Sequence, residues 1–196
     1  MGSVDGFRLL FPFVVSLCGF RLAPVVLNKS VMIADEDNTL DVDLPDEAAT
    51  QALGRRLAGA ANGGDVFALS GDLGTGKSVL ARAFIRAYCA TLEDVPSPTF
   101  TLLEVYEGGA APVHHFDLYR LKTPDEVVEL GIEDAFADGV SLVEWPDRLG
   151  PWLPANRLDV HLRPGAGTGA RRARLTGHGY WQARLIDGMG EGAIHA

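Results

Sequence analysis

The segment GDLGTGKS, residues 71–78, constrains the fold of this chain more than any other part of the sequence. It matches the pattern G-x-x-x-x-G-K-[ST], in which glycines let the backbone curl until successive N–H groups point at phosphate oxygens. Lys77 supplies a charge that can reach the phosphates, and the Ser78 hydroxyl is a suitable Mg²⁺ ligand. An apolar strand candidate at 66–69 precedes the loop, and an amphipathic helix is expected over 77–89. The sequence therefore predicts a nucleotide-binding site.

Strand and helix patterns alternate along the chain. Apolar or alternating runs predict strands at the ranges 40–44, 66–69, 100–106, 113–117, 141–144, 158–162 and 173–176. Capping residues and amphipathic spacing predict helices over 47–61 and 77–89, from Pro124 onward, and near the C-terminus from Trp181. This alternation predicts an α/β fold: a single P-loop NTPase domain with a central, mostly parallel sheet flanked by helices and a C-terminal antiparallel hairpin.

Composition limits what such a domain can bind. The chain has 196 residues, enough for one domain with a substantial core. Acidic residues outnumber basic ones by 26 to 17, and the formal net charge of −9 argues against an autonomous DNA- or RNA-binding protein. The two cysteines, Cys18 and Cys89, are too few for a disulfide framework or a four-cysteine zinc site, which favours a reducing, cytoplasmic compartment.

The N-terminal segment differs in character from the rest of the chain. Much of it is apolar, but Pro12, Arg21 and Pro24 interrupt the apolar run. A membrane-spanning helix needs about 20 apolar residues without such breaks, and a signal peptide needs a basic start, so neither is predicted. We expect residues 1–31 to be an extension without a place in the fold and residues 32–196 to form the domain. A lipid-contacting anchor and a strand packed on the domain are the alternatives for the extension.

A P-loop ATPase also needs a carboxylate at the end of a neighbouring strand, where it holds Mg²⁺ directly or through water. Glu144 ends the apolar run 141–143, which has the pattern of a buried parallel strand. Asp117 ends the more polar run 113–116. Composition and spacing alone favour neither carboxylate over the other.

Three further segments give the loop a family context: SPTFTL at 97–102, HFDLYRL at 115–121 and LVEWP at 142–146. In this order and spacing, together with the loop, they resemble the TsaE family (formerly YjeE) over about residues 40–176. The resemblance implies a bacterial P-loop ATPase required for threonylcarbamoyladenosine modification of tRNA, weak alone and not itself the threonylcarbamoyl transferase. It implies ATP and Mg²⁺ as cofactors, TsaD and TsaB as activating partners, contact with tRNA only through their complex, and no membrane association.

The resemblance also assigns roles to individual residues. Six loop residues would wrap the nucleotide phosphates: Leu73, Gly74, Thr75, Gly76, Lys77 and Ser78. Ser78 and Glu144 would hold Mg²⁺, and Asp117 would lie near the γ-phosphate and be needed for activity. Thr99 would sense the γ-phosphate from a switch-type loop. Lys77, Asp117, Glu144 and Thr99 thus form the implied catalytic set.

Glu47 and Gly169 resemble family positions close to the nucleotide. Judged by its neighbours alone, Glu47 is equally well explained as an acidic residue in the first turn of a helix. The segment around Thr99, judged in the same way, is better explained as a turn that enters a strand. Trp145 is expected to be a packing or interface residue. The histidines at 114–115 are expected in the core or on the surface, because neighbours on a strand point to opposite faces and make a poor metal site.

Two other functions use the same scaffold. A small-molecule kinase would need an acceptor pocket and a lid carrying several arginines, and Arg171, Arg172 and Arg174 cluster, although in a predicted hairpin. A nucleotide-switched binding module would bind ATP without turning it over. Both functions are alternatives to the ATP-hydrolysing subunit.

Overall fold

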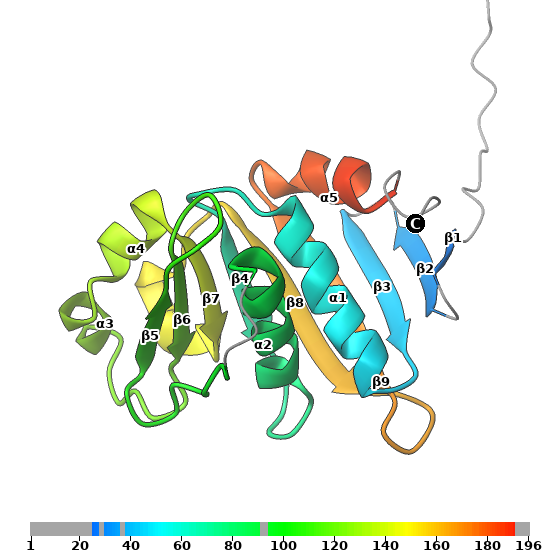
Figure 1. Ribbon diagram of the computed structural model, residues 1–196, viewed down its shortest axis with the longest axis horizontal. Helices are drawn as coiled ribbons and strands as arrows, with labels where there is room; N and C mark the ends of the chain where they lie inside the picture. The colour runs from blue at the N-terminus through cyan, green and yellow to red at the C-terminus, as the bar shows by residue number, and fades with distance from the viewer. Residues whose placement is uncertain (1–24, 28–29, 36–37, 91–93, 191–196) are drawn as a thin grey trace, which may run out of the picture.

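The computed structural model describes residues 25–27, 30–35, 38–90 and 94–190, which form one nine-stranded sheet and its covering helices (Figure 1). The strands are β1 (Val25–Leu27), β2 (Ser30–Asp35), β3 (Thr39–Leu44), β4 (Val66–Ser70), β5 (Leu103–Tyr106), β6 (Val113–Asp117), β7 (Val140–Glu144), β8 (Arg157–Pro164) and β9 (Arg171–His178). The helices are α1 (Glu47–Ala60), α2 (Lys77–Tyr88), α3 (Glu126–Glu129), α4 (Ile132–Asp138), the 3₁₀ segment η1 (Pro146–Trp152) and α5 (Trp181–Gly190).

The strand order is β1-β2-β3-β9-β8-β4-β7-β6-β5. The central strands β8, β4, β7 and β6 run parallel to one another, and antiparallel strands extend the sheet on both sides. β8 and β9 form an antiparallel hairpin, in register from Arg157 opposite His178 to Pro164 opposite Arg171. The predicted fold class is therefore confirmed: central parallel strands, flanking helices and a C-terminal hairpin.

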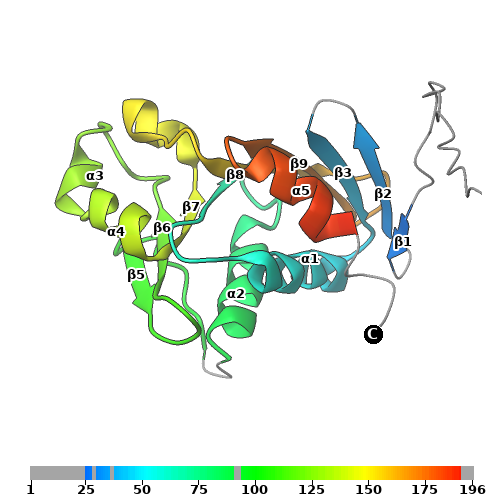
Figure 2. The same ribbon diagram turned by 90° about the horizontal axis from the view of Figure 1, so that it is seen from above.

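Helices cover both faces of the parallel strands, and each face has its own hydrophobic cluster. α1, α2 and α5 contribute to the first cluster, which includes Phe84 and Trp181. α3, α4 and η1 contribute to the second, which includes Ile132, and Figure 2 shows η1 on the side of the sheet opposite α1 and α2. Every residue of β7 is buried, because successive side chains such as Leu142 and Val143 enter different clusters.

Two elements differ from their predictions: one strand begins later than expected, and one helix is divided into two. The strand predicted at 100–106 begins later because the preceding residues form a turn, in which Leu102 has a φ of 65° and its N–H donates to the Pro98 carbonyl at 2.7 Å. The helix predicted from Pro124 is divided into α3 and α4 at Gly131, which has a φ of 70°. A residue with a positive φ interrupts strand pairing or helical hydrogen bonding, and such a residue explains both differences.

The C-terminal helix α5 is fixed to the start of β4, which agrees with the predicted packing helix. Arg184 donates to the two carboxylate oxygens of Asp65 at 2.7 and 2.9 Å, and the Tyr180 hydroxyl donates to the same carboxylate at 3.1 Å. Asp65 is 1% exposed and also accepts from the Asn62 N–H at 2.7 Å. Trp181 is buried beside this cluster.

The predicted division of the chain at residue 31 falls within β2. β2 pairs with β3 and β1 pairs with β2, both antiparallel, so strands extend the sheet on this side. Most of the predicted extension, residues 1–24, lies outside the described residues, and the division stays a prediction. Among the helices that the structure describes, none combines the length and the apolar character needed to cross a bilayer.

Candidate nucleotide-binding site

Three strand ends meet at one edge of the sheet. Glu144, the last residue of β7, lies opposite Leu69 of β4 on one side and Asp117 of β6 on the other. The P-loop, residues 71–78, leaves β4 at this edge and leads into α2 (Figure 1). The topology therefore brings both candidate carboxylates beside the loop, at the carboxyl edge where open α/β sheets bind their ligands.

The P-loop backbone depends on its glycines. The φ angles of Gly71, Gly74 and Gly76 are 130°, 78° and 102°, in a region that side chains disfavour. A side chain at Gly71 would also collide with the carbonyl oxygen of Leu162 in β8. Thr75 is 4% exposed, and its hydroxyl donates back to the loop backbone at 2.8 Å. The loop is thus curled, as its sequence predicts, and it is closely packed at Gly71 and Thr75.

Lys77 is held at the loop by neutral partners. It is 5% exposed, and its Nζ donates to the carbonyl oxygens of Gly71 at 2.7 Å and Asp72 at 2.9 Å. The same atom lies 4.0 Å from the centroid of the Trp145 ring, so the predicted packing aromatic contacts the loop lysine. Burial lowers the pKa of Lys77, against the opposing effect of nearby carboxylates, Glu144 foremost.

Ser78 and Glu144, the predicted magnesium ligands, are in direct contact. The Ser78 hydroxyl donates to Oε2 of Glu144 at 3.0 Å, and Glu144 is 2% exposed. Neighbouring ligands in a magnesium octahedron lie about 2.9 Å apart, because each Mg–O distance is about 2.0–2.1 Å. The oxygen chemistry and the spacing of this pair therefore fit Mg²⁺.

His115 holds the other oxygen of Glu144. This histidine is fully buried, and its Nε2 lies 3.0 Å from Oε1 of the carboxylate, while its Nδ1 has no hydrogen-bond partner among the described residues. Burying a bare ring nitrogen costs less than burying an N–H without an acceptor, so we assign the hydrogen to Nε2. His115 is thus a core residue, as expected, but it also orients Glu144, which no sequence pattern had indicated.

Asp117 and Thr99 form a second pair at the same edge. The Thr99 hydroxyl donates to Oδ2 of Asp117 at 3.0 Å, and the Tyr119 N–H donates to Oδ1 at 3.2 Å. Asp117 is 6% exposed, and the hydroxyls of Thr99 and Ser97 lie 3.1 Å apart. The SPTF segment is therefore tied to the end of β6, so a shift of the Thr99 loop would disturb the Asp117 carboxylate.

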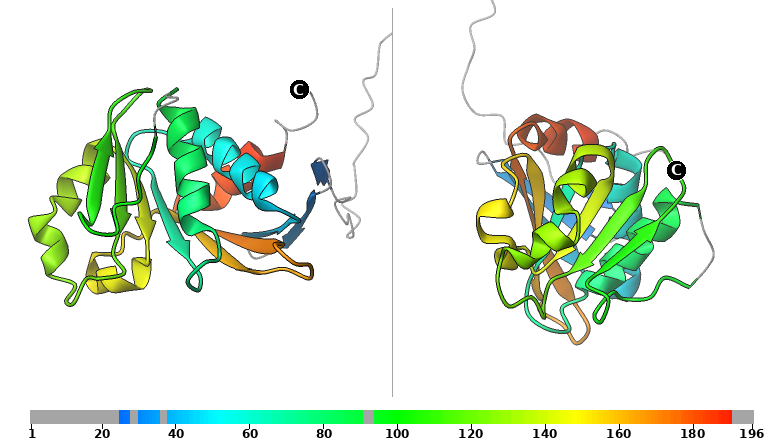
Figure 3. Two further views of the ribbon diagram at one scale, coloured as in Figure 1. Left: turned by 60° about the horizontal axis from the view of Figure 1, so that its bottom comes forward. Right: turned by 90° about the vertical axis from the view of Figure 1, so that its left-hand side faces the viewer.

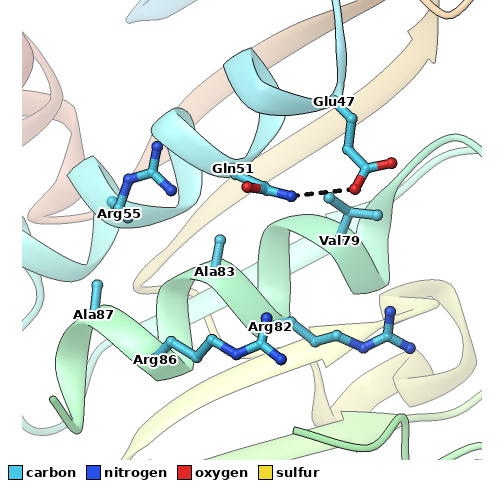
Figure 4. A pocket seen from close by; sticks show the side chains of 8 residues that line it. All are labelled: Glu47, Gln51, Arg55, Val79, Arg82, Ala83, Arg86 and Ala87. Carbon is cyan, nitrogen blue, oxygen red and sulfur yellow. Dashed lines mark hydrogen bonds between the residues drawn. The ribbon is translucent and has the colours of Figure 1, made fainter. Parts of the chain in front are cut away.

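The remaining predicted residues lie around this cluster. Glu47 begins α1 and accepts a hydrogen bond from the Gln51 side chain at 3.1 Å. It lies at one end of a groove of about 290 Å³ between α1 and α2 (Figure 4). Leu73, at the tip of the P-loop, is 79% exposed. Gly169, with a φ of 77°, lies in the β8–β9 turn, where a side chain would meet open space. For these three residues a role in nucleotide binding stays a prediction.

Arg171 contacts the P-loop, and the sequence patterns did not predict this contact. Its guanidinium donates to the carbonyl oxygens of Gly74 and Thr75. The other two arginines of the cluster pair instead with aspartates of β3. The contacts to the loop span 96 and 97 positions in sequence, so only the folded hairpin brings the residues together.

The fold, the GKS loop between β4 and α2, and the carboxylates on the adjoining strands define a protein of the P-loop NTPase class. A family model described as "Threonylcarbamoyl adenosine biosynthesis protein TsaE" matches residues 44–173, which is more than half of the chain. The chain belongs to the TsaE family, and the resemblance in the sequence motifs is thereby confirmed.

Several curated proteins called "tRNA threonylcarbamoyladenosine biosynthesis protein TsaE" are similar to the chain. The Bacillus subtilis protein is 38% identical over 131 residues, which cover 66% of this chain and 80% of the relative. The Synechocystis protein is 42% identical over 124 residues, 61% of this chain and 77% of the relative. The crystal structure of Bacillus subtilis YdiB matches with a TM-score of 0.62 and 30% identity, covering 76% of this chain and 92% of that chain.

Proposed function

We propose that this chain is the ATP-binding and ATP-hydrolysing subunit required for threonylcarbamoyl modification of the adenosine next to the anticodon in tRNAs. It is not itself the transferase. Membership of the TsaE family supports the role in tRNA threonylcarbamoyladenosine biosynthesis. The observation that carries the ATP part is the hydrogen bond between Ser78 and Glu144. It joins the P-loop to the end of a neighbouring strand in the way that a Mg²⁺–ATP site requires.

Each residue of the cluster has a task in this reaction. Ser78 and Glu144 would hold Mg²⁺, which would supply positive charge to the phosphate oxygens of ATP. Lys77 exchanges its neutral carbonyl partners for phosphate oxygens, which bind an ammonium group more strongly. Asp117 accepts a hydrogen bond from the attacking water and orients it, while Thr99 keeps that carboxylate in place.

Hydrolysis by the chain alone should be slow. P-loop enzymes gain much of their rate from an arginine that reaches the γ-phosphate, whereas Arg171 donates to loop carbonyls. The TsaD and TsaB proteins are the proposed partners that complete the site. A net charge of −9 suits a cytoplasmic subunit that contacts tRNA only through this complex, without membrane association.

The test combines genetics with nucleoside analysis. Replacing the native chain by Lys77→Ala or Glu144→Ala should abolish support of the modification, measured as the threonylcarbamoyladenosine content of total tRNA. Lys122→Ala, at an exposed lysine outside the P-loop, is the matched control and should retain the wild-type content. A normal content of the modified nucleoside in the Lys77→Ala strain would refute the proposal.

The fate of the phosphate separates this function from the other two. Release of inorganic phosphate in the presence of the partners supports hydrolysis. Phosphate transferred to a metabolite would identify a kinase, although Arg172 and Arg174 are held by aspartates of β3 rather than arranged as a lid. ATP binding without turnover in the presence of all partners would identify a nucleotide-switched module.

A further inference from the structure

The turn of the β8–β9 hairpin lies at the same edge of the sheet as the P-loop (Figures 1 and 3). Arg171, the first residue of β9, connects the two. Its Nε donates to the carbonyl oxygen of Thr75 at 3.1 Å and its Nη2 to that of Gly74 at 3.2 Å. Its Nη1 donates to the carbonyl oxygen of Ala170 in the hairpin at 2.9 Å. One guanidinium group therefore fixes two consecutive P-loop carbonyls to the hairpin.

Arg171 has different partners from the arginines beside it. Arg172 pairs with Asp43 and Arg174 with Asp41, at N–O distances of 3.4 and 2.8 Å. Within the described part of the chain, Arg171 forms no ion pair, and its hydrogen bonds go to neutral carbonyl oxygens. Its positive charge is therefore not cancelled by a paired carboxylate, and it raises the electrostatic potential at the loop.

The two loop carbonyls belong to the peptide units that carry the N–H groups of Thr75 and Gly76. In a trans peptide the C=O and N–H bonds point in opposite directions. Fixing the oxygens to the hairpin therefore turns the hydrogens to the other side of the loop, where P-loops bind phosphate oxygens. The Thr75 N–H makes a long hydrogen bond of 3.3 Å to the Asp72 carbonyl, which a charged phosphate oxygen would displace.

We propose that Arg171 is a positioning residue for the phosphates that nucleoside di- and triphosphates share, and that it acts from the outer side of the P-loop. The proposal rests on the proposed function, since it requires the loop to bind nucleotide. Because Arg171 orients peptide units and does not contact the γ-phosphate, it should support ADP and ATP binding to the same degree. The catalytic step should not depend on it.

Nucleotide affinity measured on the full chain tests this proposal. A fluorescent N-methylanthraniloyl-ADP probe, displaced by ADP or ATPγS, gives Kd values for the wild type, Arg171→Met and Arg171→Lys. Arg163→Met, at an exposed arginine of the same hairpin, is the matched control. We expect Arg171→Met to raise both Kd values about tenfold, or about 1.4 kcal/mol. Arg171→Lys should give a smaller increase, because lysine lacks the planar fork that engages two carbonyls.

Two further readouts separate positioning from a general structural role. In ATPase assays with the partners present, Arg171→Met should raise KM by the same factor as Kd and leave kcat unchanged. The melting temperature without nucleotide shows whether the variant is folded. If Arg171→Met melts below the wild type, Arg171→Lys decides, and a folded Arg171→Lys with wild-type Kd values would overturn the proposal.

The other possible results of these titrations distinguish a failure of the Arg171 inference from a failure of the proposed function. Unchanged Kd values in both Arg171 variants, with a wild type that binds nucleotide, would overturn the inference and leave the proposed function intact. Weaker binding of ATPγS alone would also overturn it, because the arginine would then act on the γ-phosphate. A wild-type chain that binds neither nucleotide would refute the proposed function itself.

Discussion

Asp117 and Glu144 lie directly opposite each other in the register of β6 and β7, yet they hold different partners. Glu144 accepts from Ser78 of the P-loop, whereas Asp117 accepts from Thr99 of the SPTF segment. Composition and spacing alone favoured neither acid, whereas the family resemblance assigned Mg²⁺ to Glu144 and a place near the γ-phosphate to Asp117. The different partners of the two carboxylates agree with that division. Substitution of Glu144 should therefore impair metal-dependent binding, and substitution of Asp117 should impair turnover.

Removing either member of the Ser78–Glu144 pair should reduce the gain in ATP affinity that Mg²⁺ provides. For Ser78→Ala and Glu144→Gln we expect that gain to fall about tenfold, or about 1.4 kcal/mol, because the first variant loses a ligand oxygen and the second loses the negative charge of the ligand. Isothermal titration calorimetry with Mg²⁺ or with EDTA measures it. Glu129→Gln, at an exposed acid of α3, is the control for the lost charge. A gain equal to that of the wild type in both variants would contradict the assigned ligands.

The hydrogen bond from His115 to Glu144 should stabilise the fold as well as the site. His115→Leu leaves a buried carboxylate oxygen without its donor, which should cost about 1–3 kcal/mol in the free energy of unfolding and weaken Mg²⁺-dependent ATP binding. His115→Gln, which keeps an N–H donor, should recover part of both. Urea denaturation and ATP titration measure the two effects, with His114→Gln as the neighbouring control. Identical behaviour of the Leu and Gln variants at position 115 would argue against the hydrogen bond.

Thr99→Val removes the hydroxyl that holds Asp117 and changes the volume of the side chain little. We expect partner-stimulated ATP turnover to fall roughly tenfold, which is less than the roughly 10²–10⁴-fold that general acid–base catalysis contributes, because Asp117 is displaced and not removed. The Kd of ADP should stay near the wild-type value. Phosphate release and ADP titration measure the two quantities. Thr101→Val, at an exposed threonine whose hydroxyl donates to Glu104, is the control. A rise in the Kd of ADP that matched the loss of turnover would point to a misfolded loop instead.

Alkaline unfolding should report the contact between α5 and the start of β4. Burial, and then the charge of Asp65, raises the pKa of Tyr180 from 10.0 to about 12. The folded state therefore favours the protonated phenol, so this stabilisation is fully present below pH 10 and is lost as the pH rises toward 12. Urea midpoints should fall more steeply over that window in the wild type than in Tyr180→Phe. Equal slopes would show that the phenol does not contribute.

Sequence patterns predicted the structure correctly where a residue's conformation depends on its neighbours in the chain. The glycines of the P-loop and the apolar run before Glu144 indicated the loop and the buried strand, because backbone freedom and strand burial leave local signatures. Since both Asp117 and Glu144 end strands, their common edge also followed from the α/β alternation. The family motifs added Thr99, whose own sequence neighbourhood favoured a simple turn.

Contacts between residues that are far apart in the sequence, or that depend on an unusual backbone angle, could not be predicted from the sequence. Trp145 meets Lys77 because its φ of 61° turns the chain directly after β7, and a tryptophan gives no local warning of that conformation. Arg171 resembled its neighbouring arginines in sequence, and only the hairpin register gives it different partners. The turn at Leu102 likewise makes β5 begin later than its continuous strand-like sequence pattern predicts.

The cluster around Asp65 fastens α5 to the residue that precedes β4, while the P-loop follows the last residue of the same strand. Figure 1 shows α5 above the sheet and the P-loop turn below it. Five residues of extended chain, roughly 17 Å, separate the two ends of β4. A fluorophore attached to the exposed Gln182 of α5 would thus lie away from the P-loop and leave the nucleotide edge open to approaching proteins.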